Sequence, residues 1–561
     1  MAKISNSKTL FLTTSPRSPE KMLPEIELLQ KGEFVGKKWN KENQVRFMNL
    51  LNEQSFYKGS DSKHLDFSAR DRINRGPKSL GLVVLKPSLE ITPAGQELLA
   101  STRKNEVFLR QLLKFQLPSP YHTDVKGSRN FWVKPYLEIL RLISTLGTLR
   151  FDELQIFGLQ LTDYNRFDEI LTKINAFRSA RATTDKRYKA FRRDYFDKEL
   201  KEIYSQEISE GNTKTRESGD TTLSKFLRTK EQNLRDYADA CFRYLRATGL
   251  VSVSHIGKSL SIAREYRDDV SYILKNTPRD PVYIDDLESY IKYLTNPKLP
   301  TLYTDDRSQL LSKLKSLFPY VSVPSSHSTA QLKELLYRLI KEKKDKIIKD
   351  NILEIKDYKH YENIQDTYQR ILSNEVYDMP LMMEWNTWRA MTMVDGGDIK
   401  ANLSFDDTGN PITTASGNMS DIVCDYEDYL LSVEVTLSSG QRQYEMEGEP
   451  VSRHLGQLKK ESQKPCYCLF IAPKISDATI SHFYILHQLE ISYYGGRSHI
   501  IPLQLSLFQK MLEDSYKADY IPSPNHIHNF LRACCEAAYT MKSEKEWYRQ
   551  IMEYAVNWLK I

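Results

Sequence analysis

The sequence predicts a multidomain protein: an N-terminal α+β part made of winged-helix-like subdomains, a helical linker and a C-terminal α/β domain. Three observations predict this organisation. A helix, a pair of short strands and a second helix follow one another repeatedly in the first half. A long charged stretch without loop composition comes next. The last third alternates strand and helix patterns, which indicates a mixed sheet covered by helices.

Length and composition set the outer limits of this prediction. A chain of 561 residues is too long for one hydrophobic core. We expect subdomains at residues 1–130 and 131–290, a linker at 291–375 and the α/β domain at 376–561. The net charge of +7 and the pI near 8.7 are compatible with a polyanionic partner but do not establish one.

The compartment follows from what the sequence lacks. The apolar patch in the opening MAKISNSKTLFLTTSPRSP is too short for a signal peptide, and no stretch reaches the length of a membrane span. The six cysteines show no zinc-finger spacing, and we interpret them as reduced packing residues. These features predict a cytoplasmic protein without a membrane partner.

The clearest winged-helix pattern is FSARDRINRGPKSLGLVVLKPSLEITPAGQELLAS, residues 67–101. It predicts a helix carrying Arg70, Arg72 and Arg75, a hairpin of strands GLVVL and LEIT, and a helix that begins at Pro93. A winged helix places its second helix in the major groove of DNA and its hairpin against phosphates. The alternative is a module that binds other proteins.

Two later segments follow a similar order. Residues 136–161 predict two helices separated at Gly147. Residues 234–270 predict a helix that ends near Gly249, followed by strands LVSVS and SLSIA around a turn at Gly257. The repetition, with arginines on the helices, favours nucleic acid over protein as the partner.

A basic stretch at residues 177–201, FRSARATTDKRYKAFRRDYFDKELK, interleaves cationic and aromatic residues. Cations spaced in this way can neutralise phosphates. The alternative is that these cations lie on a solvent-exposed helix face and bind nothing. The candidates for phosphate contact are Lys186, Arg187, Lys189, Arg192 and Arg193.

Residues 329–372 are highly charged and helix-prone, with few of the prolines and glycines expected of a loop. We interpret them as a helical connector without chemistry. The part that follows contains the strand patterns IVCDY, LLSVEVTL, CYCLFIAP and HIIPLQL, with helical segments between the later ones.

An acidic pair marks the candidate catalytic site. Glu434 lies inside the strand LLSVEVTL, thirteen residues after Asp421, where an unpaired carboxylate would be costly. Period-two alternation puts Glu434 and Thr436 on one face, beside the place to which a hairpin brings Asp421. Two converging carboxylates suit Mg²⁺, and this arrangement resembles a PD-(D/E)XK nuclease core. The usual lysine of that motif is replaced by Thr436.

Three nearby residues extend the pair. Glu447 is expected just before a helix that begins at Pro450, with His454 in its first turns. His454 can act as a general base or hold a phosphate, or it can be a hydrogen-bonded surface histidine. Glu384, in MEWNTWRAM, is a supporting ligand candidate or simply a charge near the start of a helix.

Taken together, SPRSPEK, FSARDRI, ITPAGQELLA, EWNTW, TASGNMSDI, VEVT, MEGEPVSRH and YCLFIAP occur in an order that resembles the AlwI family of type IIS restriction endonucleases. That group includes PleI, MlyI and the nicking enzyme N.BstNBI. The resemblance runs along essentially the whole chain. It implies DNA recognition by the N-terminal part and Mg²⁺-dependent cleavage by the C-terminal domain, a short fixed distance to one side of an asymmetric site.

The resemblance also implies roles for individual residues. Asp421, Glu434, Glu447 and His454 form the implied catalytic set, with Glu384 in support and Mg²⁺ on Asp421 and Glu434. A Glu-x-Thr form also occurs in related sequences, so Thr436 is compatible with the family. The implied functional partner beside double-stranded DNA is a cognate DNA methyltransferase. The candidate DNA-binding residues are Arg17, Arg70, Arg72, Lys78, Lys186, Arg187, Arg192, Arg193 and Arg243.

Several alternatives stay open at this point. One nuclease centre per chain requires a transient homodimer, a second subunit or two successive nicks to break both strands. A strand-specific nicking enzyme is therefore the nearest alternative. A sequence-specific DNA-binding protein that does not cleave, or a partner-binding scaffold, belongs to a different class.

Overall fold

The structure, a computed structural model, describes residues 4, 7–54, 57, 64–122, 130–215, 217–394, 396–406, 409–414, 419–520 and 522–561. Part of the TASGNMSDI motif, residues 415–418, lies outside the described residues. The chain separates into two compact units. The first comprises Met1–Ser254 and Lys258–Arg338, and the second His255–Gly257 and Leu339–Ile561.

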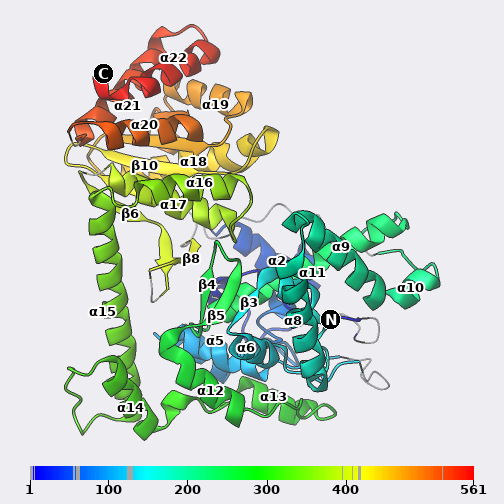
Figure 1. Ribbon diagram of the computed structural model, residues 1–561. Coiled ribbons are helices and arrows are strands. Elements are labelled where there is room, and N and C mark those ends of the chain that lie inside the picture. The colour runs from blue at the N-terminus through cyan, green and yellow to red at the C-terminus, as the bar shows by residue number, and fades with distance from the viewer. Residues whose placement is uncertain are drawn as a thin grey trace. The chain divides into compact units, whose positions relative to one another are not determined.

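The boundary between the units lies within one long helix, α15 (Thr329–Lys356), labelled in Figure 1. The stretch expected as a linker, residues 291–375, therefore contributes to both units. Its last helix, α16 (Tyr361–Leu372), buries Ile364, Tyr368 and Ile371 in the core of the second unit. We expected no catalytic residue in this stretch. The structure shows that its last helix contributes buried side chains to the core of the second unit.

The first unit is largely helical, and its strands are short. Its helices before α15 are α1 (Met22–Lys31), α2 (Lys41–Asn52), α3 (Leu65–Arg75), α4 (Pro93–Ala100), α5 (Lys104–Lys114), α6 (Pro135–Leu146), α7 (Phe151–Ile156), α8 (Phe167–Thr183), α9 (Tyr188–Ile203), α10 (Ser205–Ser209), α11 (Leu223–Arg246), α12 (Arg267–Asn276), α13 (Leu287–Thr295) and α14 (Arg307–Leu317). Its strands are β1 (Val83–Val84), β2 (Glu90–Ile91), β3 (Thr148–Arg150), β4 (Val251–Ser254) and β5 (Ser259–Ile262).

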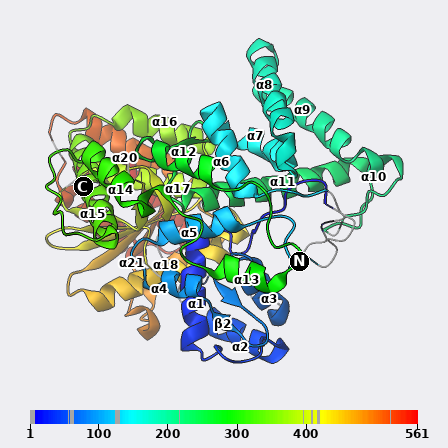
Figure 2. The ribbon, with the colours of Figure 1, turned by 90° about the horizontal axis from the view of Figure 1, so that it is seen from below.

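The first expected helix–hairpin–helix order is present as α3, the antiparallel pair β1–β2, and α4. These elements and α1–α2 are blue in Figure 2. Helix α4 begins at Pro93 because Thr92 Oγ1 accepts a hydrogen bond from the Gly95 N–H at 3.1 Å. A side chain at Gly95 would bring its Cβ to 2.1 Å from the Leu82 carbonyl oxygen, so only glycine permits this close approach.

A second group of this kind is assembled from distant segments. The strands β3, β5 and β4 form a three-stranded antiparallel sheet in that order, with α6 and α7 flanking β3 and α11 preceding β4. Helix α9, which carries the basic stretch, packs against α11 (Figure 2). The sequence showed the local orders, but not that β3 joins a hairpin about a hundred residues later.

The second unit contains a five-stranded mixed sheet with strand order β12-β11-β10-β9-β6. The strands β6, β9 and β10 are antiparallel neighbours, whereas β10, β11 and β12 run parallel. Its elements after α16 are α17 (Met379–Met393), β6 (Asp398–Ala401), β7 (Leu403–Phe405), β8 (Pro411–Thr414), β9 (Ile422–Asp425), β10 (Leu430–Val435), α18 (Gln441–Glu461), β11 (Cys466–Ala472), α19 (Asp477–Gln488), β12 (Ile500–Gln504), α20 (Leu505–Lys517), α21 (Pro524–Thr540) and α22 (Glu544–Val556).

The helix after β10 differs from the expectation. It begins at Gln441, so Pro450 lies inside α18 and Glu447 is already helical. A proline removes one backbone donor but does not by itself end a helix that packing holds in place. The early start puts Gln443, Glu447 and His454 on one face of the helix, at spacings of four and seven residues.

Two further expectations concern exposure to membranes and oxidants. No helix in the described part of the chain combines the length and apolar composition needed to cross a bilayer. All six cysteines are buried and unbridged, as expected of packing residues.

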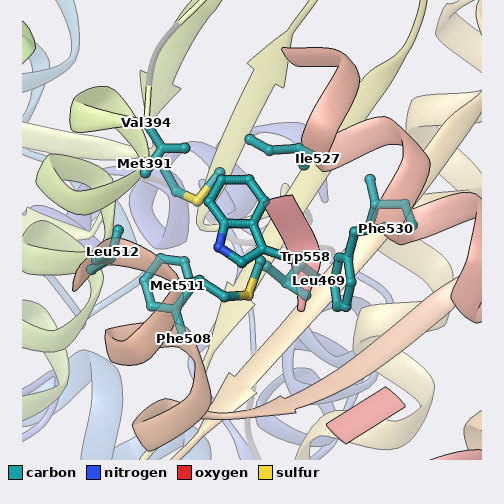
Figure 3. Close-up of a pocket in the computed structure, with 10 residues that line it drawn as sticks. Met391, Val394, Leu469, Phe508, Met511, Leu512, Ile527, Phe530 and Trp558 are labelled. Carbon is teal, nitrogen blue, oxygen red and sulfur yellow. The ribbon is translucent and has the colours of Figure 1, made fainter. Parts of the chain in front are cut away.

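A small apolar cavity lies on one side of the sheet in the second unit. Its volume is about 20 Å³, and Figure 3 shows the indole ring of Trp558 among Met391, Met511 and Phe530. Leu469 of β11 also lines it. The lining side chains are apolar apart from the indole nitrogen of Trp558, too few polar groups to hold a water molecule. We regard the cavity as a packing defect in the core.

Enlarging this cavity tests the packing. Replacing Leu469, which is buried, by alanine should lower the unfolding free energy of the second unit by about 2–5 kcal/mol. Leu489→Ala, at a side chain 52% exposed, should change it by less than about 0.5 kcal/mol. Denaturant unfolding followed by tryptophan fluorescence would measure both; equal stability of the two variants would contradict the packing described.

Candidate active site

The carboxylate of Asp421 is fixed against strand β10. Strand β9 pairs antiparallel with β10 so that Ile422 faces Val433, which places the preceding residue beside Glu434. The Val435 backbone N–H donates to Asp421 Oδ2 at 2.9 Å. The Asn402 N–H donates to the Asp421 carbonyl at 2.8 Å. The structure therefore brings Asp421 and Glu434 together, as the spacing predicted.

Glu434 is 5% exposed, and a histidine side chain contacts its carboxylate. His454 Nδ1, from α18, lies 2.9 Å from Glu434 Oε1, and the histidine is equally buried. A carboxylate can only accept this hydrogen bond, so Nδ1 is the donor. The contact satisfies part of the buried charge that the sequence left unexplained.

The neighbouring strand adds a thiol to this environment. Ser432 and Glu434 of β10 face Cys468 and Phe470 of β11 across the parallel ladder. Burial raises the pKa of the Cys468 thiol, and the charges of Glu434 and Asp421 raise it further. The thiol stays protonated beside the carboxylates, so it is a packing residue of the site.

Glu447 reaches the same region from α18. The Thr436 hydroxyl donates to Glu447 Oε1 at 2.8 Å. Thr436 follows Glu434 by two residues and shares its face of the strand. Asp421, Glu434, Glu447 and His454 are thus linked in one area at the end of β10. The sequence pattern places Thr436 beside Glu434 but gives no sign of its contact with Glu447, which joins a strand to a helix eleven residues later.

Glu384, the fifth candidate, comes from a different element. It lies in the first half of α17, which packs against β9 and β10, and it is half-buried. The adjoining helix surface is fixed by Trp388, whose Nε1–H donates to the Ile399 carbonyl at 3.2 Å. The helix that carries Glu384 thus packs against the strands of the acidic pair.

The donor set can be compared with the needs of a metal ion. In the described ranges of the chain, no group of three or more histidine, cysteine, aspartate and glutamate side chains has the arrangement of a metal site. Mg²⁺ requires fewer protein ligands, since one or two carboxylates with water and substrate phosphate suffice. Asp421 and Glu434 meet that requirement.

Comparison with known proteins identifies the family. The model of the AlwI restriction endonuclease matches residues 78–511. This chain belongs to the AlwI restriction endonuclease family. Membership makes it a site-specific DNA endonuclease that binds DNA. The match does not distinguish PleI, MlyI or N.BstNBI, so likeness to those enzymes in particular stays a prediction.

Two solved structures show weaker likeness to this AlwI-family chain. One is the small subunit (R.BspD6I2) of the heterodimeric restriction endonuclease R.BspD6I, at 25% identity and a TM-score of 0.30, covering 34% of this chain and 98% of that one. The other is the BpuJ1 endonuclease binding domain in complex with pyrene- and phenanthrene-modified DNA, at 15% identity and a TM-score of 0.34, covering 53% and 100%. With scores this low, neither adds to the assignment. No curated protein matches the chain.

The DNA-binding candidates of this family member differ in their surroundings. Arg72 is largely buried, pairs with the fully buried Glu25 and lies over the ring of Tyr57. Burial raises the pKa of Glu25, which Arg72 partly opposes. Arg70, two residues earlier on α3, is 49% exposed, pairs with Asp66 one turn away at 3.2 Å and lies over the ring of the exposed Phe67. Arg72 supports the fold, whereas Arg70 faces solvent.

The remaining candidates divide in a similar way. Arg17 pairs with Asp236 at 2.8 Å and Asp239 at 3.1 Å, both on α11. The more enclosed side chains are Arg192, paired with Glu231; Arg243, paired with Asp239; and Lys78, over the ring of Tyr121 with its pKa lowered by burial. The exposed side chains are Lys186 and Arg193, both beside Asp194, while Arg187 caps the start of α9.

The two arginines of α3 give a matched test. Arg72→Ala leaves Glu25 buried without its ion pair and should lower the unfolding free energy of the first unit by about 3–5 kcal/mol. Arg70→Ala should change stability by less than about 1 kcal/mol and weaken specific DNA binding by about 1–3 kcal/mol if Arg70 reads a base. Denaturation and binding at fixed salt measure the two effects. A stable Arg72→Ala protein would exclude the structural role.

Proposed function

We propose that this AlwI-family protein is a type IIS endonuclease. It recognises a short asymmetric sequence in duplex DNA and hydrolyses phosphodiester bonds a fixed short distance to one side, using Mg²⁺. The observation that carries the proposal is the convergence of Asp421, Glu434, Glu447 and His454 at the end of β10. A carboxylate as buried as Glu434, with Asp421 and Glu447 half-buried near it, is costly unless a cation or a reaction uses it.

The surrounding sheet supports a PD-(D/E)XK-like interpretation of the second unit. Glu434 lies in β10 and Asp421 immediately precedes its antiparallel neighbour β9. The motif's third position, Thr436, follows Glu434 on the same face. A helix and a parallel strand, α18 and β11, follow directly. The cleavage reaction is assigned to this unit.

Asp421 and Glu434 would hold Mg²⁺, with Glu447 as the third carboxylate nearby. When bound, the ion lowers the pKa of a water molecule and stabilises negative charge on the phosphoryl oxygens. His454 donates its Nδ1 proton to Glu434, so in the neutral ring Nε2 is the atom that can accept a proton from water. The Glu434–His454 contact also orients the carboxylate before substrate binds.

The first unit is assigned to recognition. The group α3, β1, β2 and α4 and the group α6, β3, α7, α11, β4 and β5 both support winged-helix-like subdomains. The exposed cations Arg70 on α3, Arg193 on α9 and Lys186 just before α9 would contact bases or phosphates. Separate units for reading and cutting explain why the cut falls outside the recognised bases.

The proposal implies further partners. Double-stranded DNA in the cytoplasm is the substrate, and a cognate DNA methyltransferase would protect the host's copies of the recognised sequence. Cutting of both strands requires a second chain, a different subunit or two successive nicks by the same centre.

The proposed activity is tested by incubating the full chain with supercoiled plasmid and Mg²⁺, with EDTA as the control, and sequencing both strands by run-off. Paired cuts at one fixed offset from a short asymmetric sequence are expected. Cuts confined to one strand would point to a nicking enzyme. Specific binding without metal-dependent cutting would overturn the proposal.

The acidic pair is tested by isosteric substitution. Asp421→Asn and Glu434→Gln keep the side-chain shape but remove a negative charge, so cleavage should fall by at least about a hundredfold because charge stabilisation of the reaction is lost. Specific DNA binding should stay within about twofold, because recognition is assigned to the other unit. The matched control is Ser432→Ala, at a buried hydroxyl of the same strand that donates to the Tyr467 carbonyl at 3.2 Å and also contacts the Cys468 thiol. Normal cleavage by either acidic variant would remove that residue from the site.

A further inference from the structure

The hydroxyl of Thr436 connects β10 to the carboxylate of Glu447. It donates to Glu447 Oε1 at 2.8 Å and accepts from the Ser438 backbone N–H at 3.0 Å. Thr436 is 7% exposed, so water competes little for these bonds. Because the hydroxyl accepts from one side, its proton is directed to the other, toward the carboxylate.

Other contacts hold the helix that carries Glu447. Gln443, fully buried one turn earlier in α18, donates from Nε2 to the Ser438 carbonyl at 2.9 Å and the Lys474 carbonyl at 2.8 Å. Its Oε1 accepts from the Ser476 N–H at 2.8 Å. This clamp joins α18 to the loops after β10 and β11. The backbone at Glu447 therefore does not depend on the Thr436 side chain.

The Glu447 side chain itself has more freedom. It is half-buried, and a glutamate has several rotatable bonds whose ordering costs free energy. A hydrogen bond from a buried donor selects one of these conformations. The donor that selects it, Thr436, follows Glu434 by two residues and shares its face of the strand.

We propose that Thr436 is a positioning residue that holds the Glu447 carboxylate beside Glu434 for the cleavage reaction. This inference rests on the proposed function and refines it. A lysine at this position, as in the usual PD-(D/E)XK motif, would form an ion pair with Glu447 and neutralise it. A threonine hydroxyl orients the same carboxylate and leaves its negative charge in the site. Thr436, in place of the usual lysine, therefore occurs together with a further carboxylate, that of Glu447.

The experiment compares variants of the full chain on plasmid containing the mapped site, in Mg²⁺. Thr436→Val should slow cleavage by about ten- to a hundredfold, the range expected for losing a hydrogen bond to a charged group. Thr436→Ser keeps the hydroxyl and should stay within about threefold of the unmodified chain. Thr392→Val is the matched control, since that buried hydroxyl donates to the Trp388 carbonyl of its own helix at 2.8 Å.

A double variant separates positioning from general destabilisation. If Thr436 acts through Glu447, Thr436→Val combined with Glu447→Gln should cleave no more than about threefold more slowly than Glu447→Gln alone. Specific DNA binding and the unfolding midpoint of Thr436→Val should match those of Thr392→Val.

Three results would overturn the inference: an unchanged rate for Thr436→Val, equal losses for Thr436→Ser and Thr436→Val, or multiplied losses in the double variant. A full chain that binds specifically but never cleaves would overturn the proposed function, and this inference with it. A cleaving chain with an unaffected Thr436→Val variant would overturn the inference alone.

Discussion

The second unit is organised around one buried carboxylate. Glu434 sits in the middle strand of a five-stranded sheet, where an unpaired charge would destabilise the fold by several kcal/mol. His454 supplies the hydrogen bond that makes this position tolerable, and Asp421 is held against the same strand by a backbone N–H. The buried negative charge thus lies at the site of the proposed reaction, where a bound cation would stabilise it.

Helix α18 contributes more side chains to the candidate site than any other element described above. It supplies Gln443, Glu447 and His454 at positions that share one face, and each contacts a different part of the strand ends. Because these contacts come from one rigid element, the groups are held at fixed separations. A site built on a helix and a strand is positioned more precisely than one built on loops.

The first unit distributes its arginines between two tasks. Arg72 and Arg243 pair with carboxylates inside the fold, whereas Arg70 and Arg193 face solvent on α3 and α9. A basic sequence motif contains both buried, ion-paired arginines and solvent-facing arginines, and the motif alone does not show which residue belongs to which group. Arg17, held by two aspartates of α11, lies between these cases because it is exposed yet doubly paired.

The sequence by itself predicted the helix–hairpin–helix orders of the first unit, the strands β9 to β12 of the second and the closeness of Asp421 to Glu434, because period-two alternation, turn residues and spacing are local properties. The family followed from the ordered motifs, which resemble the AlwI enzymes. Tertiary structure decided the rest. That β3 pairs with β5, that Tyr361–Leu372 enters a core, and that Thr436 binds Glu447 all depend on contacts between segments that no local pattern encodes. The sequence predicted that α18 begins at Pro450, because proline is common in the first turn of a helix. In the structure Pro450 lies inside the helix. The contacts of Gln443 before it and His454 after it stabilise the helix on both sides.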